Sequence, residues 1–216
     1  MERGLKMEIF EAIDNRKTIR KYDDYKPTTE EVKRIINSAR LAPSAINMQN
    51  WKFIAVFNQN VKEELANSVL ASYDRILSNL DDETKASVER YKGHSTFFKN
   101  APFIIVCVEK FAPSFMGGVL EKAGIKDDEI KLMRPDSYLL SMGGAIENML
   151  LSAYALGLGS CWMVAPVLGE SGMRKTLNLK EDEKIVSILA FGRPAKDATD
   201  KRSPKKELDE IMEIIE

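Results

Sequence analysis

Histidine and cysteine, on which much enzyme chemistry depends, are scarce in this sequence. His94 is the only histidine among 216 residues, and it lies in a polar segment with no nucleophile elbow. The chain has no HExxH motif, no CxxC pair and no acidic calcium-binding loop. A metal site and a hydrolase triad are therefore not expected, and we interpret His94 as a solvated or helix-terminal residue.

Nucleotide-binding fingerprints are also missing. No GxxxxGK[S/T] motif occurs, and the pair Gly157 and Gly159 lacks the third glycine and the preceding strand of a dinucleotide-binding turn. If the protein carries out redox chemistry, a cofactor of another kind has to supply it.

The charge and hydropathy of the chain are ordinary. A formal charge of −1, with 30% charged and 44% hydrophobic residues, gives no reason to expect nucleic acid or a membrane as partner. No apolar run approaches the roughly 18 residues of a membrane span, and the first ten residues contain no apolar signal core. Cys107 and Cys161 lie far apart inside apolar segments, as reduced core thiols do. We expect a cytoplasmic protein whose residues 1–216 form one domain, with a variable helical region at about 61–135.

Hydrophobic periodicity predicts helices and strands in irregular alternation, which favours the α+β class over a doubly wound sheet. The residues from Thr28 to Glu31 carry a capping box, and the helix after it should end before Pro43. The other predicted helices are 7–15, 61–99 and 138–157, and the predicted strands are 52–57, 103–108, 161–164 and 184–191.

Three further segments carry structural expectations. The helix at 138–157 is apolar nearly all round, so it should be buried on all sides, with a partner subunit covering it. The glycines and prolines of 112–136 indicate a lid or excursion, and an amphipathic stretch ends the chain.

The most informative segment runs from Arg16 to Trp51. It begins R-K-T-I-R-K-Y, and arginines beside a hydroxyl suit a bound phosphate, because a guanidinium fork matches phosphate oxygens two at a time. It ends in a loop in which Ser44, Asn47 and Gln49 offer donors and acceptors to a heterocycle or polyol. Together they predict a phosphorylated organic cofactor.

Four segments in order carry a resemblance to a known family: R-K-T-I-R-K-Y, A-P-S-A-I-N-M-Q-N-W-K-F, A-L-G-L-G-S-C-W, and L-A-F-G-R-P followed by K-R-S-P. They resemble the nitroreductase family of FMN enzymes, over residues 8 to about 210. The resemblance implies a nitroreductase-like fold, with a central mixed sheet of four to five strands surrounded by helices. It also implies an obligate homodimer, with the long central helix at its interface and FMN bound between the subunits.

The resemblance also implies roles for individual residues. Arg16 and Arg202 would hold the phosphate, with Lys201 close by; Lys17 and Thr18 would line the ribityl and pyrimidine side; Arg20 would lie at the flavin N1–C2=O edge. The second chain would contribute Pro43, Ser44, Ala45 and Asn47, with Gln49 as an addition. Trp162, Met163, Val164 and Ala165 would lie along the isoalloxazine, with a backbone N–H aimed at N5. Several family members have an acidic residue where this chain has Val164, so the bond to N5 would depend on backbone alone.

The implied activity is an FMN-dependent oxidoreductase with ping-pong kinetics. Hydride would pass from NADH or NADPH to flavin N5 and then to nitroaromatics or quinones, with no side-chain acid or base. Because flavin reduction builds negative charge at N1–C2=O, a cation that cannot deprotonate, such as Arg20, would stabilise the reduced state.

Four alternatives stay open. A reductive dehalogenase like iodotyrosine deiodinase has the same fold and would need an ordered lid, for which the chain offers Glu121, Lys122, Lys131 and Tyr138. A flavin-destroying enzyme of cobalamin biosynthesis shares the fold as well. A non-catalytic FMN sensor or store, or a helical interaction protein with surface charge only, would be separated by colour and by reduction with NADH and NADPH.

Overall fold

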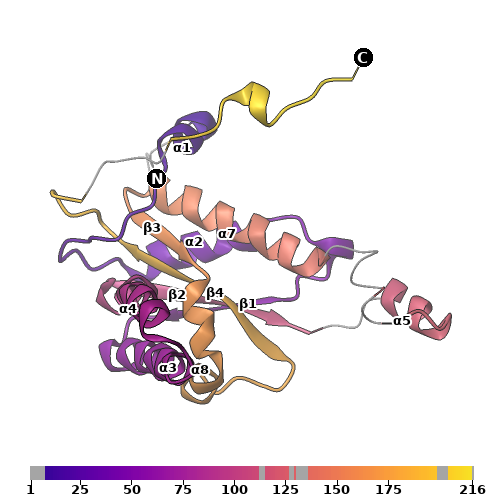
Figure 1. Ribbon diagram of the computed structural model, residues 1–216. Helices are drawn as coiled ribbons and strands as arrows, with labels where there is room; N and C mark the ends of the chain where they lie inside the picture. Colours follow the sequence, from indigo (N-terminus) through magenta and orange to yellow (C-terminus); the bar gives the residue numbers. More distant parts are fainter. Residues whose placement is uncertain (1–7, 112–114, 127–128, 130–135, 199–203, 216) are drawn as a thin grey trace.

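The protein is built around a four-stranded sheet with helices on both faces (Figure 1). The computed structural model describes residues 8–111, 115–126, 129, 136–198 and 204–215. Strand order is β1-β2-β4-β3, and every neighbouring pair is antiparallel. The α+β class is confirmed. A mixed sheet of parallel and antiparallel strands was expected, but among the described residues the one parallel pairing is an isolated bridge between Thr18 and Ser160. The strands are β1 (Trp51–Val56), β2 (Phe103–Lys110), β3 (Gly159–Met163) and β4 (Glu183–Gly192).

Two helices cover one face of the sheet and three lie on the other (Figure 1). The first layer consists of α2 (Thr29–Arg40) and α7 (Ser137–Ala155), which pack on β2 and β4 around the stacked rings of Phe103 and Phe191. The second layer contains α3 (Gln59–Leu77), α4 (Asp82–Thr96) and α8 (Glu170–Thr176). Residues 103–108 of β2 are all apolar and buried, and successive side chains point to opposite faces of the sheet, so both faces of this strand are covered and the sheet forms the middle of the core.

The local signals in the sequence are confirmed. Thr28 Oγ1 accepts the Glu31 N–H at 3.2 Å while the Glu31 carboxylate accepts the Thr28 N–H at 2.7 Å, so the capping box starts α2. The helix ends at Arg40, before Pro43. The short helix α1 spans Ile9–Asn15.

Within a single chain α7 is not buried on all sides, and the expectation that a partner subunit covers the rest stays a prediction. One side of α7 packs into the core, but Leu139 and Leu140 on the other are 45% and 65% exposed. Gly144 is exposed as well, in the middle of the helix. In a three-layer chain an outer helix keeps one side toward solvent.

The remaining segments lie at the periphery. Helix α5 (Phe115–Lys122) stands apart from the layers in Figure 1, so in one chain it covers no part of the sheet. Residues 204–215 are not a helix but an open segment with one 3-10 turn, Leu208–Glu210, and exposed apolar side chains. The other 3-10 turns are Ala45–Asn47, Phe97–Asn100 and Ala165–Gly169. Among the described residues, no helix has the length and apolar character needed to cross a membrane.

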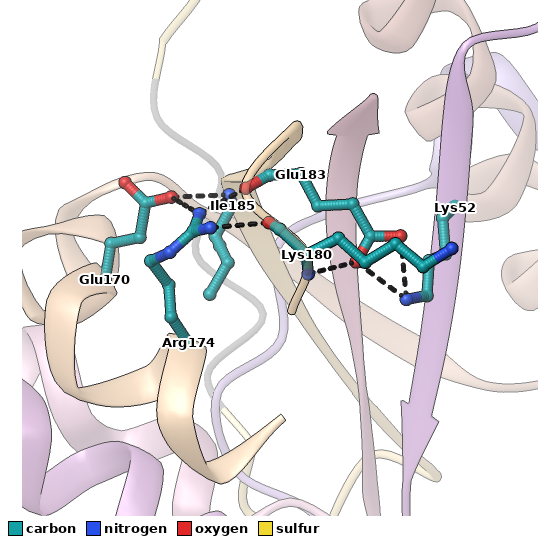
Figure 2. Close-up of polar contacts among 6 residues, drawn as sticks. All are labelled: Lys52, Glu170, Arg174, Lys180, Glu183 and Ile185. Atoms are coloured by element: carbon teal, nitrogen blue, oxygen red, sulfur yellow. Dashed lines mark hydrogen bonds and ion pairs between the residues drawn. The ribbon is translucent and has the colours of Figure 1, made fainter. Parts of the chain in front are cut away.

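A polar network fixes the start of β4 (Figure 2). Lys52 Nζ on β1 reaches Glu183 Oε1 at 2.9 Å, and the Lys180 N–H donates to the same carboxylate at 3.1 Å. Arg174 of α8 donates to the backbone carbonyls of Lys180 and Glu183, which joins this helix to the turn before β4. Because Glu183 is buried, these partners replace the water that its charge would otherwise need.

Candidate cofactor site

The segment after α1 lies along the beginning of β3. The Ile19 N–H donates to the Ser160 carbonyl at 2.8 Å, next to the Thr18–Ser160 bridge. Tyr22 Oη donates to the Ile19 carbonyl at 2.8 Å and to Ala190 at 3.2 Å, which fastens the segment to β4 as well. The positions of Arg16, Lys17 and Arg20 are therefore set by backbone pairing to the sheet.

A cavity of about 570 Å³ opens beside this segment, a size typical of cofactor and ligand sites. Arg20 lines it together with the run from β3 into the following turn: Trp162, Met163, Val164 and Ala165. In β3 the side chains alternate, so Met163 points into the core while Trp162 is 43% exposed, and Val164, which follows the strand, is 61% exposed. An exposed indole and isopropyl group beside a guanidinium form an apolar wall with one fixed positive charge.

Arg20 also reaches the floor of this cavity. Burial raises the pKa of the Cys161 thiol, and the nearby Arg20 guanidinium opposes that rise. Burial likewise raises the pKa of Tyr22, again opposed by Arg20. Both groups are thus neutral at pH 7, and Arg20 contributes the positive charge of this cluster.

Arg16 and Lys17 line a smaller cavity of about 100 Å³ with Gly159 and Ser160. The Arg16 Nε atom lies 3.2 Å from Glu147 Oε1 of α7, so its guanidinium is held against that helix. The two cavities lie on the same short segment, one with Arg16 and the other with Arg20.

The loop at 43–49 has a strained and exposed conformation. Ile46, Asn47 and Gln49 have φ angles of 46°, 56° and 48°, in the left-handed region that side chains other than glycine rarely adopt. Ser44 Oγ accepts the Gln49 N–H at 3.2 Å, and Ser141 Oγ of α7 accepts the Ala45 N–H at 3.1 Å. Such strain persists only when the surroundings impose it, and it often marks functional sites.

The structure brings together some of the expected site residues and leaves others apart. Arg20 and the run from Trp162 to Ala165 share one cavity, Arg16 and Lys17 share the next, and Thr18 lies between them on Ser160. Pro43, Ser44, Ala45, Asn47 and Gln49 line neither of these two cavities. Lys201 and Arg202 lie outside the described residues.

Comparison with known proteins identifies the family to which this fold belongs. Residues 13–193 match the nitroreductase family. The chain belongs to that family. The expectation of a nitroreductase-family oxidoreductase is therefore confirmed.

Relatives of this nitroreductase-family chain include NAD(P)H nitroreductases and iodotyrosine deiodinases. It is 26% identical over 193 residues to a putative NADH dehydrogenase/NAD(P)H nitroreductase of Methanothermobacter thermautotrophicus, covering 88% of this chain and 79% of that protein. It is 25% identical over 207 residues to an iodotyrosine deiodinase of Thermotoga neapolitana, covering 94% and 95%.

Solved structures share the fold. A BluB-like flavoprotein from Clostridium difficile 630 superposes with a TM-score of 0.88 at 27% identity, covering 97% of this chain and all of that one. A nitroreductase with bound FMN from Bacteroides fragilis has a TM-score of 0.70 at 22% identity, covering 98% and 100%.

The cavity residues of this nitroreductase-family chain fit FMN. Its phosphate needs cationic donors, and Arg16 would supply one, with Lys17 beside it in the same cavity. Its flat ring needs an apolar wall, and the ring edge that gains charge needs a fixed cation; Trp162, Val164 and Arg20 offer both.

The sequence interpretation missed one wall of the larger cavity. Ser87, Tyr91 and His94 of α4 line it, as do Phe97 and Cys161. His94 was expected to be a solvated or helix-terminal residue, and it is in the last turn of α4, but it also faces the cavity. The spacing of four and three residues between Ser87, Tyr91 and His94 was a signal that they share one face of a helix. Nothing in the neighbouring sequence indicated that this face lines the same cavity as β3.

Proposed function

We propose that this protein is an FMN-dependent oxidoreductase that transfers hydride from NADH or NADPH to flat, electron-poor acceptors such as nitroaromatics and quinones. The observation that carries the proposal is Arg20 beside the exposed apolar wall of β3, in a cavity of suitable size. When bound, FMN would supply hydride acceptance and donation at its N5 atom in two half-reactions, which is ping-pong kinetics.

Arg20 would stabilise the negative charge that builds on reduction of the cofactor. Its guanidinium is a permanent cation, and the backbone next to it is held by the hydrogen bond from the Ile19 N–H to the Ser160 carbonyl. A cation fixed before the reaction does not have to reorganise during it, so its effect is realised in the transition state.

Phosphate binding would fall to Arg16, with Arg202 and Lys201 as further donors from the segment outside the described residues, and Lys17, which lines the same cavity as Arg16, would lie along the ribityl side. Trp162 and Val164 would support the ring and exclude water from it, and the backbone from Trp162 to Ala165 would face the ring atoms. Because Val164 is apolar, that contact would be made by backbone alone.

The working form would be a homodimer with FMN at the interface. The outer side of α7 leaves Leu139 and Leu140 exposed, and α1 exposes Ile9, Phe10 and Ile13. Large apolar side chains exposed on two helices indicate an interaction site. The loop at 43–49 is fixed to the same helix through Ser141, so it would reach the partner's cofactor rather than its own.

The absorbance spectrum of the purified protein tests the proposal. We expect a yellow protein with one FMN per chain, bleached by NADH or NADPH under anaerobic conditions and restored by a nitroaromatic or quinone. A colourless preparation that does not bind added FMN would contradict the proposed function. A flavin that stays oxidised under excess of both nicotinamides would favour a store, and irreversible loss of flavin absorbance in air would favour a flavin-destroying enzyme.

A deiodinase-like activity is the second candidate, favoured by the 25% identical relative of that name. Glu121 and Lys122 lie at the end of α5, Tyr138 in the first turn of α7, and Lys131 outside the described residues. Faster turnover of a halotyrosine than of a nitroaromatic would decide for it.

A further inference from the structure

One face of α4 forms a polar wall of the cofactor cavity. Ser87, Tyr91 and His94 are spaced four and three residues apart, so they lie on the same side of the helix, and all three line the cavity with Arg20. No role in FMN binding follows from them, because the phosphate donors and the fixed cation lie on the segment from Arg16 to Arg20.

Contacts with α3 hold this wall of α4 in place. The Tyr73 hydroxyl of α3 is 2.6 Å from Ser95 Oγ in the last turn of α4, and both residues are buried. Lys92 Nζ reaches Asp74 of α3 at 2.7 Å. Polar groups on a rigid element keep their geometry, so the cavity side of α4 can select a ligand by shape and hydrogen bonding.

The two walls differ in chemistry. The cavity is lined by Trp162 of β3 and by Val164, just after that strand, which present apolar groups. Helix α4 presents a phenol and an imidazole whose rings meet edge to face, 6.4 Å between centroids and 72° between planes. The electron acceptors of a flavin site are flat rings that carry nitro, carbonyl or phenolic oxygens. Such a molecule matches both walls, its ring on the apolar side and its oxygen toward α4.

We propose that the wall of α4, through the Tyr91 hydroxyl and a His94 ring N–H, recognises the oxygen substituent of the electron acceptor. The inference rests on the proposed function and deepens it, because it assigns acceptor choice to residues distinct from those that hold FMN. His94 and Tyr91 are thus specificity residues: they donate hydrogen bonds to the acceptor and leave the affinity for FMN unchanged.

A matched pair of ligands tests the wall. Nitrobenzene and toluene have the same ring, but only nitrobenzene carries oxygens. Each is titrated into the oxidised FMN-loaded protein, with no reductant present, and binding is followed by the change in flavin absorbance. His94→Leu and Tyr91→Phe remove donors, His94→Gln keeps an N–H donor, and Lys85→Gln on the opposite side of α4 is the control.

In His94→Leu and Tyr91→Phe we expect nitrobenzene to bind roughly 3- to 10-fold more weakly, the range of one neutral hydrogen bond, with toluene unchanged. His94→Gln should recover most of the loss, and Lys85→Gln should match the wild type. The dissociation constant and reduction potential of FMN should stay constant throughout.

Three results would overturn the inference while the proposed function stands. Equal weakening of nitrobenzene and toluene would show packing alone, and unchanged nitrobenzene affinity in both donor-removing variants would show no contact. A shifted FMN affinity or potential with unchanged nitrobenzene binding would place His94 on the cofactor. A wild-type chain that binds no FMN would overturn the proposed function itself.

Discussion

Ile19 packs so closely on Gly159 that no side chain fits at the glycine. A Cβ at Gly159 would lie 2.6 Å from Ile19 Cγ1 and 2.7 Å from its Cβ, shorter than any ordinary contact. The backbone of the segment from Arg16 to Arg20 therefore approaches β3 only because position 159 is glycine. This contact joins two motifs far apart in the sequence, and the two cavities lie on either side of it.

Gly159→Ala should displace the cofactor-binding segment. We expect a loss of about 1–3 kcal/mol in the free energy of unfolding, as in other overpacked cores, and weaker binding of FMN. Gly93→Ala is the control, because a Cβ there meets nothing within 4 Å and alanine is favoured inside a helix. Urea unfolding and FMN titration measure both effects, and unchanged FMN affinity in Gly159→Ala would remove the role given to this contact.

Arg16 and Arg20 should have separable effects. Arg16→Ala should raise the dissociation constant of FMN about 10- to 100-fold, since a charged hydrogen bond contributes about 1.5–3 kcal/mol. It also leaves Glu147, now unpaired, near the phosphate. Fluorescence titration of FMN checks this, with the reduction potential of the bound flavin expected to change little.

Arg20→Ala should instead make the flavin harder to reduce. Loss of about 1.5–3 kcal/mol of stabilisation corresponds to a two-electron potential lowered by roughly 30–60 mV. Arg20→Lys retains the charge and should recover part of the difference. Equal potentials in Arg20→Ala and the wild type, measured by dye-coupled anaerobic reduction, would end this assignment.

The ion pair between half-buried Lys52 and buried Glu183 predicts an acid-sensitive stability. The Lys52 ammonium and the Lys180 N–H hold the pKa of the Glu183 carboxyl below its usual range. A carboxyl with a lowered pKa in the folded state stabilises the protein above its unfolded pKa of about 4.3, and this stability is lost as the pH falls below that value. Glu183→Gln should therefore cost about 1–3 kcal/mol at pH 7, and less as the pH falls below about 4.

Glu181→Gln, two residues earlier and exposed, provides the matched control. Urea unfolding of both variants and the wild type at several pH values gives the comparison. A difference between Glu183→Gln and the wild type that persists unchanged at low pH would contradict the electrostatic explanation and indicate a packing effect.

Local signals in the sequence located most of the fold. The capping box at Thr28 and Glu31 acts within four residues, so it could be identified without tertiary information. The wall around His94 could not, because it depends on α4 meeting β3 across about 70 residues of sequence. Periodicity also showed that α7 is apolar on both sides, but a pattern cannot tell whether the chain itself or a second copy covers Leu140.

Leu140→Glu tests that last point together with the cofactor site. A charge on the outer side of α7 would be expensive to bury in an interface and harmless in water, so the variant should fold and elute as a monomer in size-exclusion chromatography. If the loop at 43–49 completes the partner's site, the monomer should also lose most of its FMN. Leu168→Glu, on the α3 side of the sheet, should leave both properties unchanged. A monomeric Leu140→Glu protein that binds FMN as tightly as the wild type would separate the cofactor site from the dimer, because a site complete in one chain needs no strained loop from another.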